Sequence, residues 1–293
     1  MHLQSYNFWM LLETTLIFKT MLILSSQIGL VLLGCFYFIK NAHYAYENNT
    51  TLFGLKFRGS VNMKNQLDLV PYVDTFPRKM VMDGENGSPS KMKLAENSDE
   101  IIKYLKEGYY QEKSTPVFNG LVTLWMITLG LTLFFAATGI ATLIGVILFT
   151  IQSLLMGPLL GFIMLEMDEN DGYRALKIVF FVTILTGIIG YGDFISFSES
   201  GFLTFFLFFG LLGLIIFNIS RAFMTMSRES VRASAIFGAV LFSIFLLYDF
   251  NLVRKRQDMI GGNTWENAFE LAFAIYLDII NLLLEILEAM GNS

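Results

Sequence analysis

Cysteine is almost absent from this 293-residue chain, which holds only Cys35, inside an apolar run. A single thiol excludes a disulfide framework within the chain and a thiolate metal site, so we assign Cys35 a packing role. Two histidines, His2 and His43, are too far apart in the sequence to indicate a site. Charged residues make up only 15% of the chain, and its net charge of −5 with no basic stripe argues against nucleic-acid binding.

Long apolar runs take the place of these missing features. The chain is 54% hydrophobic and 15% aromatic, with a mean hydropathy of +0.57, and this composition is typical of a membrane protein. At about 20 residues per span, we predict an all-α polytopic membrane protein, because backbone polar groups in lipid must bond within a helix. Seven spans are expected, at residues 15–39, 117–137, 140–165, 174–192, 202–220, 233–253 and 267–290.

Two of these assignments depend on weak signals. The first run is longer than a signal-peptide core and no small-residue cleavage site follows it, so we predict a retained first span. The stretch LGLTLFFAATGIATLIGVILF is compatible with one long span or with two. Only the small residues of AATGIAT, at 136–142, indicate a turn between a second and a third span.

Three regions follow from this pattern: residues 1–39 with the first span, an extramembrane insert at 40–116, and a six-span core at 117–293. The insert segment NNTTLFGLKFRGSVNMKNQLDLVPYV indicates short strands. The segment NSDEIIKYLKEGYYQEK predicts an amphipathic helix with Asn97, Ser98 or Asp99 as its cap. The insert is therefore either a small folded lid or a loosely ordered loop, and we favour a partly folded one.

The two most informative residues are acids inside apolar spans, Asp249 in LLYDFN and Asp278 in YLDIIN. If the last two spans form an antiparallel hairpin, residues equidistant from its turn lie side by side. The midpoint of positions 249 and 278 falls inside IGGNTWE, the best turn signal in the region. We therefore expect the two carboxyl groups to face each other, roughly 15–20 Å from the turn and near the middle of the bilayer.

Polar neighbours and further acids accompany this pair. Amides at Asn251 and Asn281 and hydroxyls at Tyr248 and Tyr276 are the expected supporting groups. The last span also carries Glu270, Glu285 and Glu288, and a helix with so many acids should lie inside the bundle.

Two adjacent carboxylates in a low-dielectric site cannot both stay ionised without a counter-charge. Three outcomes are open: a shared proton, a bound cation or a basic partner. The first two together make a cation site for which protons compete, and carboxylate and amide oxygens suit calcium. The alternative is that the acids only hydrogen-bond helices together. We favour a functional role, because acids within a membrane span are costly.

The same residues resemble a known family. YLDIINLLLEILEAMG, preceded by LFSIFLLYDFNLV, closely resembles the C-terminal signature of the Bax-inhibitor family of membrane proteins. FKTMLILSSQIGLVLLG, GPLLGFIML and SGFLTFFLFFGLLGLIIFNI are similar to that family's first, third and fifth spans. The resemblance implies a seven-helix bundle with the last helix at its centre. It also implies a pH-sensitive calcium leak with Asp249 and Asp278 as the sensor, and no cofactor.

The family is tied to calcium stores and cell-death suppression in eukaryotes, and some bacterial members modulate a membrane protease. The resemblance therefore implies an inner or plasma membrane for a bacterial protein and an endoplasmic-reticulum-type membrane for a eukaryotic one. It also implies an N-terminus inside the cell. The basic residues of the short loops favour the opposite orientation, because cytoplasmic loops are rich in lysine and arginine. An N-terminus outside makes cytoplasmic the loops that hold or adjoin Arg174, Lys177, Arg221, Arg228 and Arg232. An N-terminus inside leaves the cytoplasmic loops with only Arg254, Lys255 and Arg256.

The chain departs from the family pattern in two ways. The insert is not part of that pattern. Bacterial members latch the pore with an arginine near the start of the third span, where this chain has AATGIATLIG and no base. Arg254 or a base of the insert is the candidate substitute, and Glu270 and Glu285 are the acids considered for a latch or pore mouth.

An enzyme is the rival interpretation. GYGDF, at 190–194, fits the G-x-G-D pattern of intramembrane aspartyl proteases, and Asp249 in YD fits their second motif. The order of the two motifs is reversed and no Pro-Ala-Leu follows, so we do not expect an enzyme. The sequence predicts a pH-gated cation leak whose partners are the lipid bilayer, calcium ions and protons. The alternative is a non-conducting regulator that binds a membrane protease or another membrane protein.

Overall fold

A computed structural model describes residues 14–61, 67–72, 78–82, 89–94, 98–106, 115–167, 169–224 and 226–291. The chain divides into two compact units, each described here by itself. The first unit comprises residues 1–32, 127–154 and 170–293, and the second comprises residues 33–126 and 155–169.

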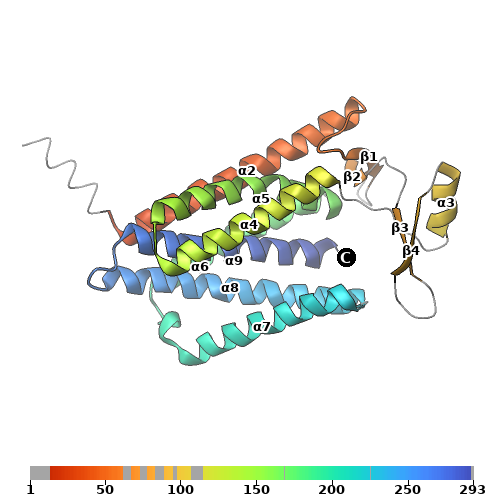
Figure 1. Cartoon of the computed structure of the whole chain (residues 1–293). Coiled ribbons are helices and arrows are strands. Elements are labelled where there is room, and N and C mark those ends of the chain that lie inside the picture. The colour runs from red at the N-terminus through yellow and green to blue at the C-terminus, as the bar shows by residue number, and fades with distance from the viewer. Residues whose placement is uncertain are drawn as a thin grey trace, which may run out of the picture. The chain divides into compact units, whose positions relative to one another are not determined.

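Seven long helices dominate the described residues (Figure 1). Six of them are long and apolar enough to cross a membrane, and the seventh, α9, carries acids along its length. Each predicted span corresponds to one helix, which confirms an all-α polytopic membrane protein, and α2 continues beyond its predicted span to Glu47. The seven are α2 (Leu16–Glu47), α4 (Pro116–Thr138), α5 (Thr142–Met167), α6 (Glu169–Tyr191), α7 (Gly201–Phe223), α8 (Arg228–Asp258) and α9 (Trp265–Gly291).

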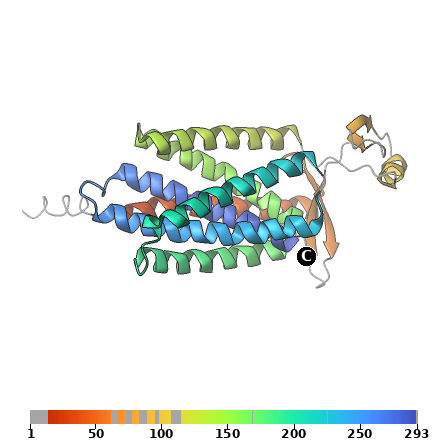
Figure 2. The same cartoon turned by 90° about the horizontal axis from the view of Figure 1, so that it is seen from below.

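The first unit is built on the hairpin of α8 and α9, which lie side by side (Figure 1). The turn between them contains Gly261 with a φ of 77°, a backbone conformation that glycine adopts without strain. The Thr264 hydroxyl then accepts a hydrogen bond from the Asn267 amide and so caps the start of α9. Figure 2 shows α7 running along α8. The sequence prediction of an antiparallel pair of last helices is confirmed.

Buried side chains occur on every side of α9. Leu271, Ala272 and Phe273 are consecutive and all buried, and buried residues recur through the rest of the helix. Successive residues point 100° apart around a helix, so such a run means that neighbours cover the whole circumference. Phe149 of α5 supplies part of this cover, because its ring packs against those of Phe273 and Tyr276. Asp278, in the middle of this helix, is thereby buried inside the bundle.

The turn between α4 and α5 lies where the small residues indicated it. α4 ends at Thr138 and α5 begins at Thr142. Gly139 and Ala141 between them have positive φ values of 66° and 54°. The stretch is therefore two helices joined by a tight turn, and not one long span.

The second unit contains the insert. Strand β1 (Lys56–Val61) pairs antiparallel with β2 (Leu67–Tyr72), and β3 (Arg78–Met82) pairs antiparallel with β4 (Pro89–Leu94). A short helix follows, α3 (Ser98–Lys106). The strands and the helix confirm a partly folded insert; the candidate cap Asn97 lies outside the described residues.

Side chains of three segments hold the first hairpin within the second unit. Leu55, Phe57 and Leu69 are buried. The Glu169 carboxylate lies 2.8 Å from Nε2 of His43 on α2, and its backbone amide donates to the Asp68 carboxylate of β2. The start of the insert is therefore fixed to the helices of its own unit by apolar and polar contacts.

Candidate functional site

Asp249 of α8 and Asp278 of α9 meet inside the first unit. Each residue is only 8% exposed, and the two carboxyl groups lie within hydrogen-bonding reach of each other. The symmetry of the hairpin about its turn thus places them as the sequence predicted. Two buried carboxylates this close repel each other strongly, so the pair needs a proton or a counter-charge to be stable.

A basic residue lies near the pair, but it is Arg256 and not the predicted Arg254. The Arg256 guanidinium forms two parallel bonds with the Glu270 carboxylate, at 2.5 and 2.9 Å. It also donates to Asn267 at 3.4 Å, and its charge acts on Asp249. We call Arg256 and Glu270 the clasp, because they join α8 to α9 between the aspartate pair and the turn.

The sequence contained a signal for the clasp. Arg256 follows Asp249 by seven residues, or two helical turns, and so shares its face of α8. Positions 256 and 270 are also equidistant from the turn, like 249 and 278. The candidate Arg254 lies on another face, where it pairs with Asp258 at 3.3 Å and covers the ring of Tyr191.

Asn251 does not support the carboxyl pair, which corrects the sequence prediction. Its amide nitrogen donates to the Gly190 carbonyl and the Asp193 carboxylate. Its oxygen accepts from the backbone amide and the hydroxyl of Ser198. These four bonds fill the capacity of the side chain, so Asn251 holds the connection between α6 and α7 against α8.

Asp193, the acid of the G-x-G-D motif, belongs to this second cluster. One carboxylate oxygen accepts from Asn251 and the other pairs with Lys255 at 3.0 Å. These bonds, first from Asn251 and then from Lys255, hold the pKa of Asp193 below its ordinary value. Asp193 and Asp249 therefore each have another partner and do not form a dyad with each other.

Replacing Asp193 by asparagine should lower the unfolding temperature of the solubilised protein at pH 7. Asparagine tolerates the positive φ of 51° at this position, so the change isolates the charge. Because the folded-state pKa is lowered, the stabilisation exists above the unfolded value of about 3.9 and is lost as the pH falls below it. Thermal unfolding at several pH values tests this. Asp171→Asn, at an exposed pair with Arg174, is the control and should change little.

The remaining predicted residues occupy different surroundings. Tyr276 is buried against Phe149 of α5, with ring centroids 4.8 Å apart, and Asn281 is half-buried, one turn beyond Asp278. Tyr248, half-buried on α8, precedes Asp249 and lies within the electrostatic range of Arg256. Of the supporting groups expected from the sequence, Tyr248 is the one that the structure relates to the clasp.

Two acids lie at the far end of α9. The Glu285 carboxylate packs against Gly238 of α8, where an added Cβ would lie 2.5 Å from its carboxyl carbon. Glu288 pairs with Arg221 of α7 at 2.6 Å. Of the two acids considered for a latch or pore mouth, Glu270 therefore lies in the clasp and Glu285 lies away from it.

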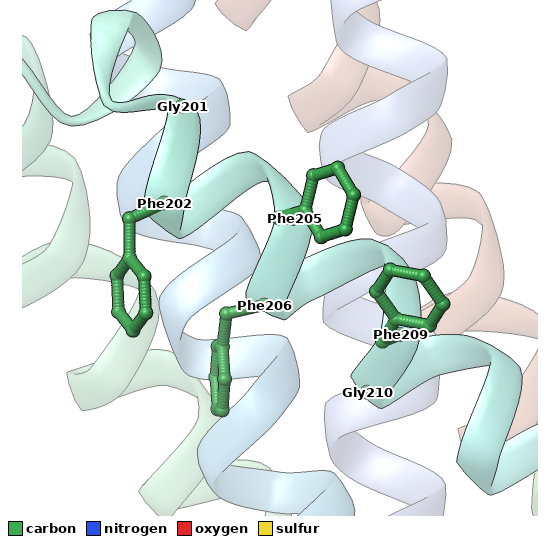
Figure 3. A pocket seen from close by; sticks show the side chains of 6 residues that line it. All are labelled: Gly201, Phe202, Phe205, Phe206, Phe209 and Gly210. Carbon is green, nitrogen blue, oxygen red and sulfur yellow. The ribbon is translucent and has the colours of Figure 1, made fainter.

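No metal cluster marks another site in the described part of the chain. No group there brings together three or more His, Cys, Asp or Glu side chains. A hollow of about 630 Å³ on α7 is lined by Gly201, Phe202, Phe205, Phe206, Phe209 and Gly210 (Figure 3). Its phenylalanine rings point outward to both sides of the helix, as expected of a surface in contact with lipid.

Comparison with protein families identifies the part of the chain that carries the site. A sequence model described as inhibitor of apoptosis-promoting Bax1 matches residues 103–293. The match begins within α3 and includes both aspartates, the clasp and the Asp193 cluster, and it leaves out α2 and the two β-hairpins. With about two thirds of its residues matched, this integral, multi-pass membrane protein belongs to the Bax-inhibitor family.

Proposed function

We propose that the protein is a pH-sensitive calcium leak in which Asp249 and Asp278 sense the pH. The observation that supports this most directly is the contact between the two buried carboxyl groups, next to a clasp that joins the same two helices. Acids within membrane spans mark ion and proton pathways far more often than they serve packing alone.

Proton release would change the balance of forces between α8 and α9. With one proton shared, the carboxyl groups hydrogen-bond and hold the helices together. When the pH rises and that proton leaves, two anions face each other in a low-dielectric site and repel. The proposal therefore assigns the closed contact to the protonated form and places greater flux at higher pH.

Calcium is the proposed substrate because the oxygens of the pair are hard ligands. Two carboxylates alone provide fewer oxygens than calcium takes from a resident site. Weak binding is what a conduction path needs, since an ion must leave as readily as it enters. The pair is thus proposed as a point of transit for calcium and a binding site for protons.

Calcium influx into proteoliposomes tests the proposal. Purified protein is reconstituted with an internal calcium dye, and influx is measured at about pH 6, 7 and 8 against protein-free vesicles. We expect influx above the empty vesicles that increases with pH. Folded protein that passes no more calcium than empty vesicles at any pH would exclude a channel.

A regulator without transport activity is the second candidate. It is favoured by the insert, whose hairpins and helix are folded and lie largely outside the residues that match the family. In that case the insert binds a membrane protease or another membrane protein, and the aspartates affect stability only. We further propose that the chain is not an enzyme, because Asp193 and Asp249 are engaged with different partners.

A further inference from the structure

Neutral polar side chains gather where α5 packs against α9 in the first unit. Gln152 and Ser153 of α5 are fully buried, and Tyr276 of α9 is 1% exposed. Phe149 lies one turn before Gln152 and Ser153 and packs edge-on against the Tyr276 ring. The Tyr276 hydroxyl faces that of Ser153. The three side chains thus occupy one level of the interface.

Their polar atoms lack hydrogen-bond partners among the residues that the structure describes. This holds for both amide atoms of Gln152, for Oγ of Ser153 and for the hydroxyl of Tyr276. Oε1 of Gln27 on α2 shares this property, and so do Oδ2 of Asp278 and the hydroxyls of Thr20 and Thr183 elsewhere in the unit. Buried polar groups are almost always paired with protein or with ordered water. Four unpaired polar atoms on Gln152, Ser153 and Tyr276 therefore indicate a bound ligand.

Several hydroxyls elsewhere in the first unit are satisfied within their own helices. Thr150, Thr186 and Ser243 each donate to the carbonyl four residues earlier in their own helix. Ser153 has the same option and does not use it. Gln27 donates one bond, to Thr150 on α5, and leaves its oxygen free. The hydroxyl of Ser153 is therefore not satisfied within its own helix, and it lies close to that of Tyr276 across the interface.

The chemistry of these groups selects the ligand. Gln152 presents a donor and an acceptor, and the two hydroxyls each do both. A cation would satisfy the oxygens and leave the Gln152 nitrogen unpaired, while an anion would accept from that nitrogen and from the hydroxyls and leave the Gln152 oxygen unpaired. Water bonds to both kinds of group and binds buried sites that offer two to four polar partners. We propose that Gln152, Ser153 and Tyr276 hold internal water molecules between α5 and α9.

This water site lies on a different face of α9 from the aspartate pair. Asp278 follows Tyr276 by two residues, so both lie at nearly the same depth of α9, but side chains at this spacing point to nearly opposite sides of a helix. Tyr276 faces α5, whereas Asp278 faces Asp249 of α8. The site itself does not depend on whether the protein conducts calcium.

Radiolytic hydroxyl-radical labelling of the full chain in lipid nanodiscs tests the proposal. X-rays generate radicals from water, and these modify side chains beside internal water, which mass spectrometry then locates. We expect Tyr276 to be modified in spite of its burial, and Phe269, equally buried on the same helix, to remain unmodified. Equal protection of Tyr276 and Phe269 in the wild-type protein would overturn the proposal, whatever its transport activity.

Two variants sharpen the test. Gln152→Leu removes the donor and the acceptor at similar volume and should abolish the labelling of Tyr276, and Ser153→Ala serves as a second variant if the first does not fold. Thr186→Val removes a buried hydroxyl that its own helix already satisfies, so labelling should persist. Undiminished labelling of Tyr276 in a folded Gln152→Leu protein would also overturn the proposal.

Discussion

Replacing Asp249 or Asp278 by asparagine is expected to hold calcium influx at its low-pH level from about pH 6 to 8. The asparagine amide can donate to the remaining carboxylate, so the contact between α8 and α9 is kept. It cannot lose a proton in this range, and the repulsion that separates two carboxylates no longer develops. Influx into proteoliposomes, measured at each pH for both variants and the wild type, gives the result directly.

Asp258→Asn is the matched control for this experiment. Asp258 lies on the same helix, but it is an exposed acid paired with Arg254. Its loss should leave the pH dependence of influx intact. A variant at Asp249 or Asp278 that responds to pH like the wild type would place the sensor elsewhere, and a variant with high influx at low pH would reverse the proposed sign.

Removing the clasp should have the second large effect. In Arg256→Gln or Glu270→Gln the paired bonds between α8 and α9 are lost, and the closed arrangement loses a contact that the open one is not expected to make. If the clasp favours the closed arrangement over the open one by about 1–3 kcal/mol, its loss changes the equilibrium between the two by roughly 5- to 150-fold. We expect influx to rise by a factor within this range at every pH, with the aspartate pair still able to titrate.

The exchanged pair Arg256→Glu with Glu270→Arg separates the clasp from a general loss of stability. If the bond between the two helices is what matters, the double variant should recover much of the wild-type influx while each single change does not. Arg254→Gln, two residues away and paired with Asp258, should leave influx unchanged. Equal effects of Arg254→Gln and Arg256→Gln would show that net charge near the turn, and not the clasp, controls the leak.

The spans and the aspartate pair were predictable from the sequence because each depends on local rules. A bilayer requires about 20 apolar residues per helix, and the small residues of AATGIAT indicated the turn between two of these helices. A hairpin brings together positions equidistant from its turn, so the contact of Asp249 with Asp278 followed from counting residues. The same count reaches Arg256 and Glu270. Glu270 was among the residues predicted for a latch or pore mouth, but the predicted base was Arg254, whereas Arg256 is the one that shares the helix face of Asp249.

Other residues could not be placed from sequence. Asn251 is two positions from Asp249, and nothing local shows that its amide faces the connection between α6 and α7. That choice depends on residues about 55 positions away, which only the packing of α6 against α8 brings near. The partners of Asp193 are decided in the same way.

By itself, the sequence determined that this chain is a helical membrane protein with a costly acid in each of its last two spans, because lipid admits few backbone structures and few charges. Only the tertiary structure decided which polar groups surround those acids. It placed Arg256 with Glu270, removed Asn251 from the pair, and gathered Gln152, Ser153 and Tyr276 where α5 meets α9. The physical reason is that a helix face is defined by its own sequence, whereas the neighbour it meets is defined by how all the helices pack together.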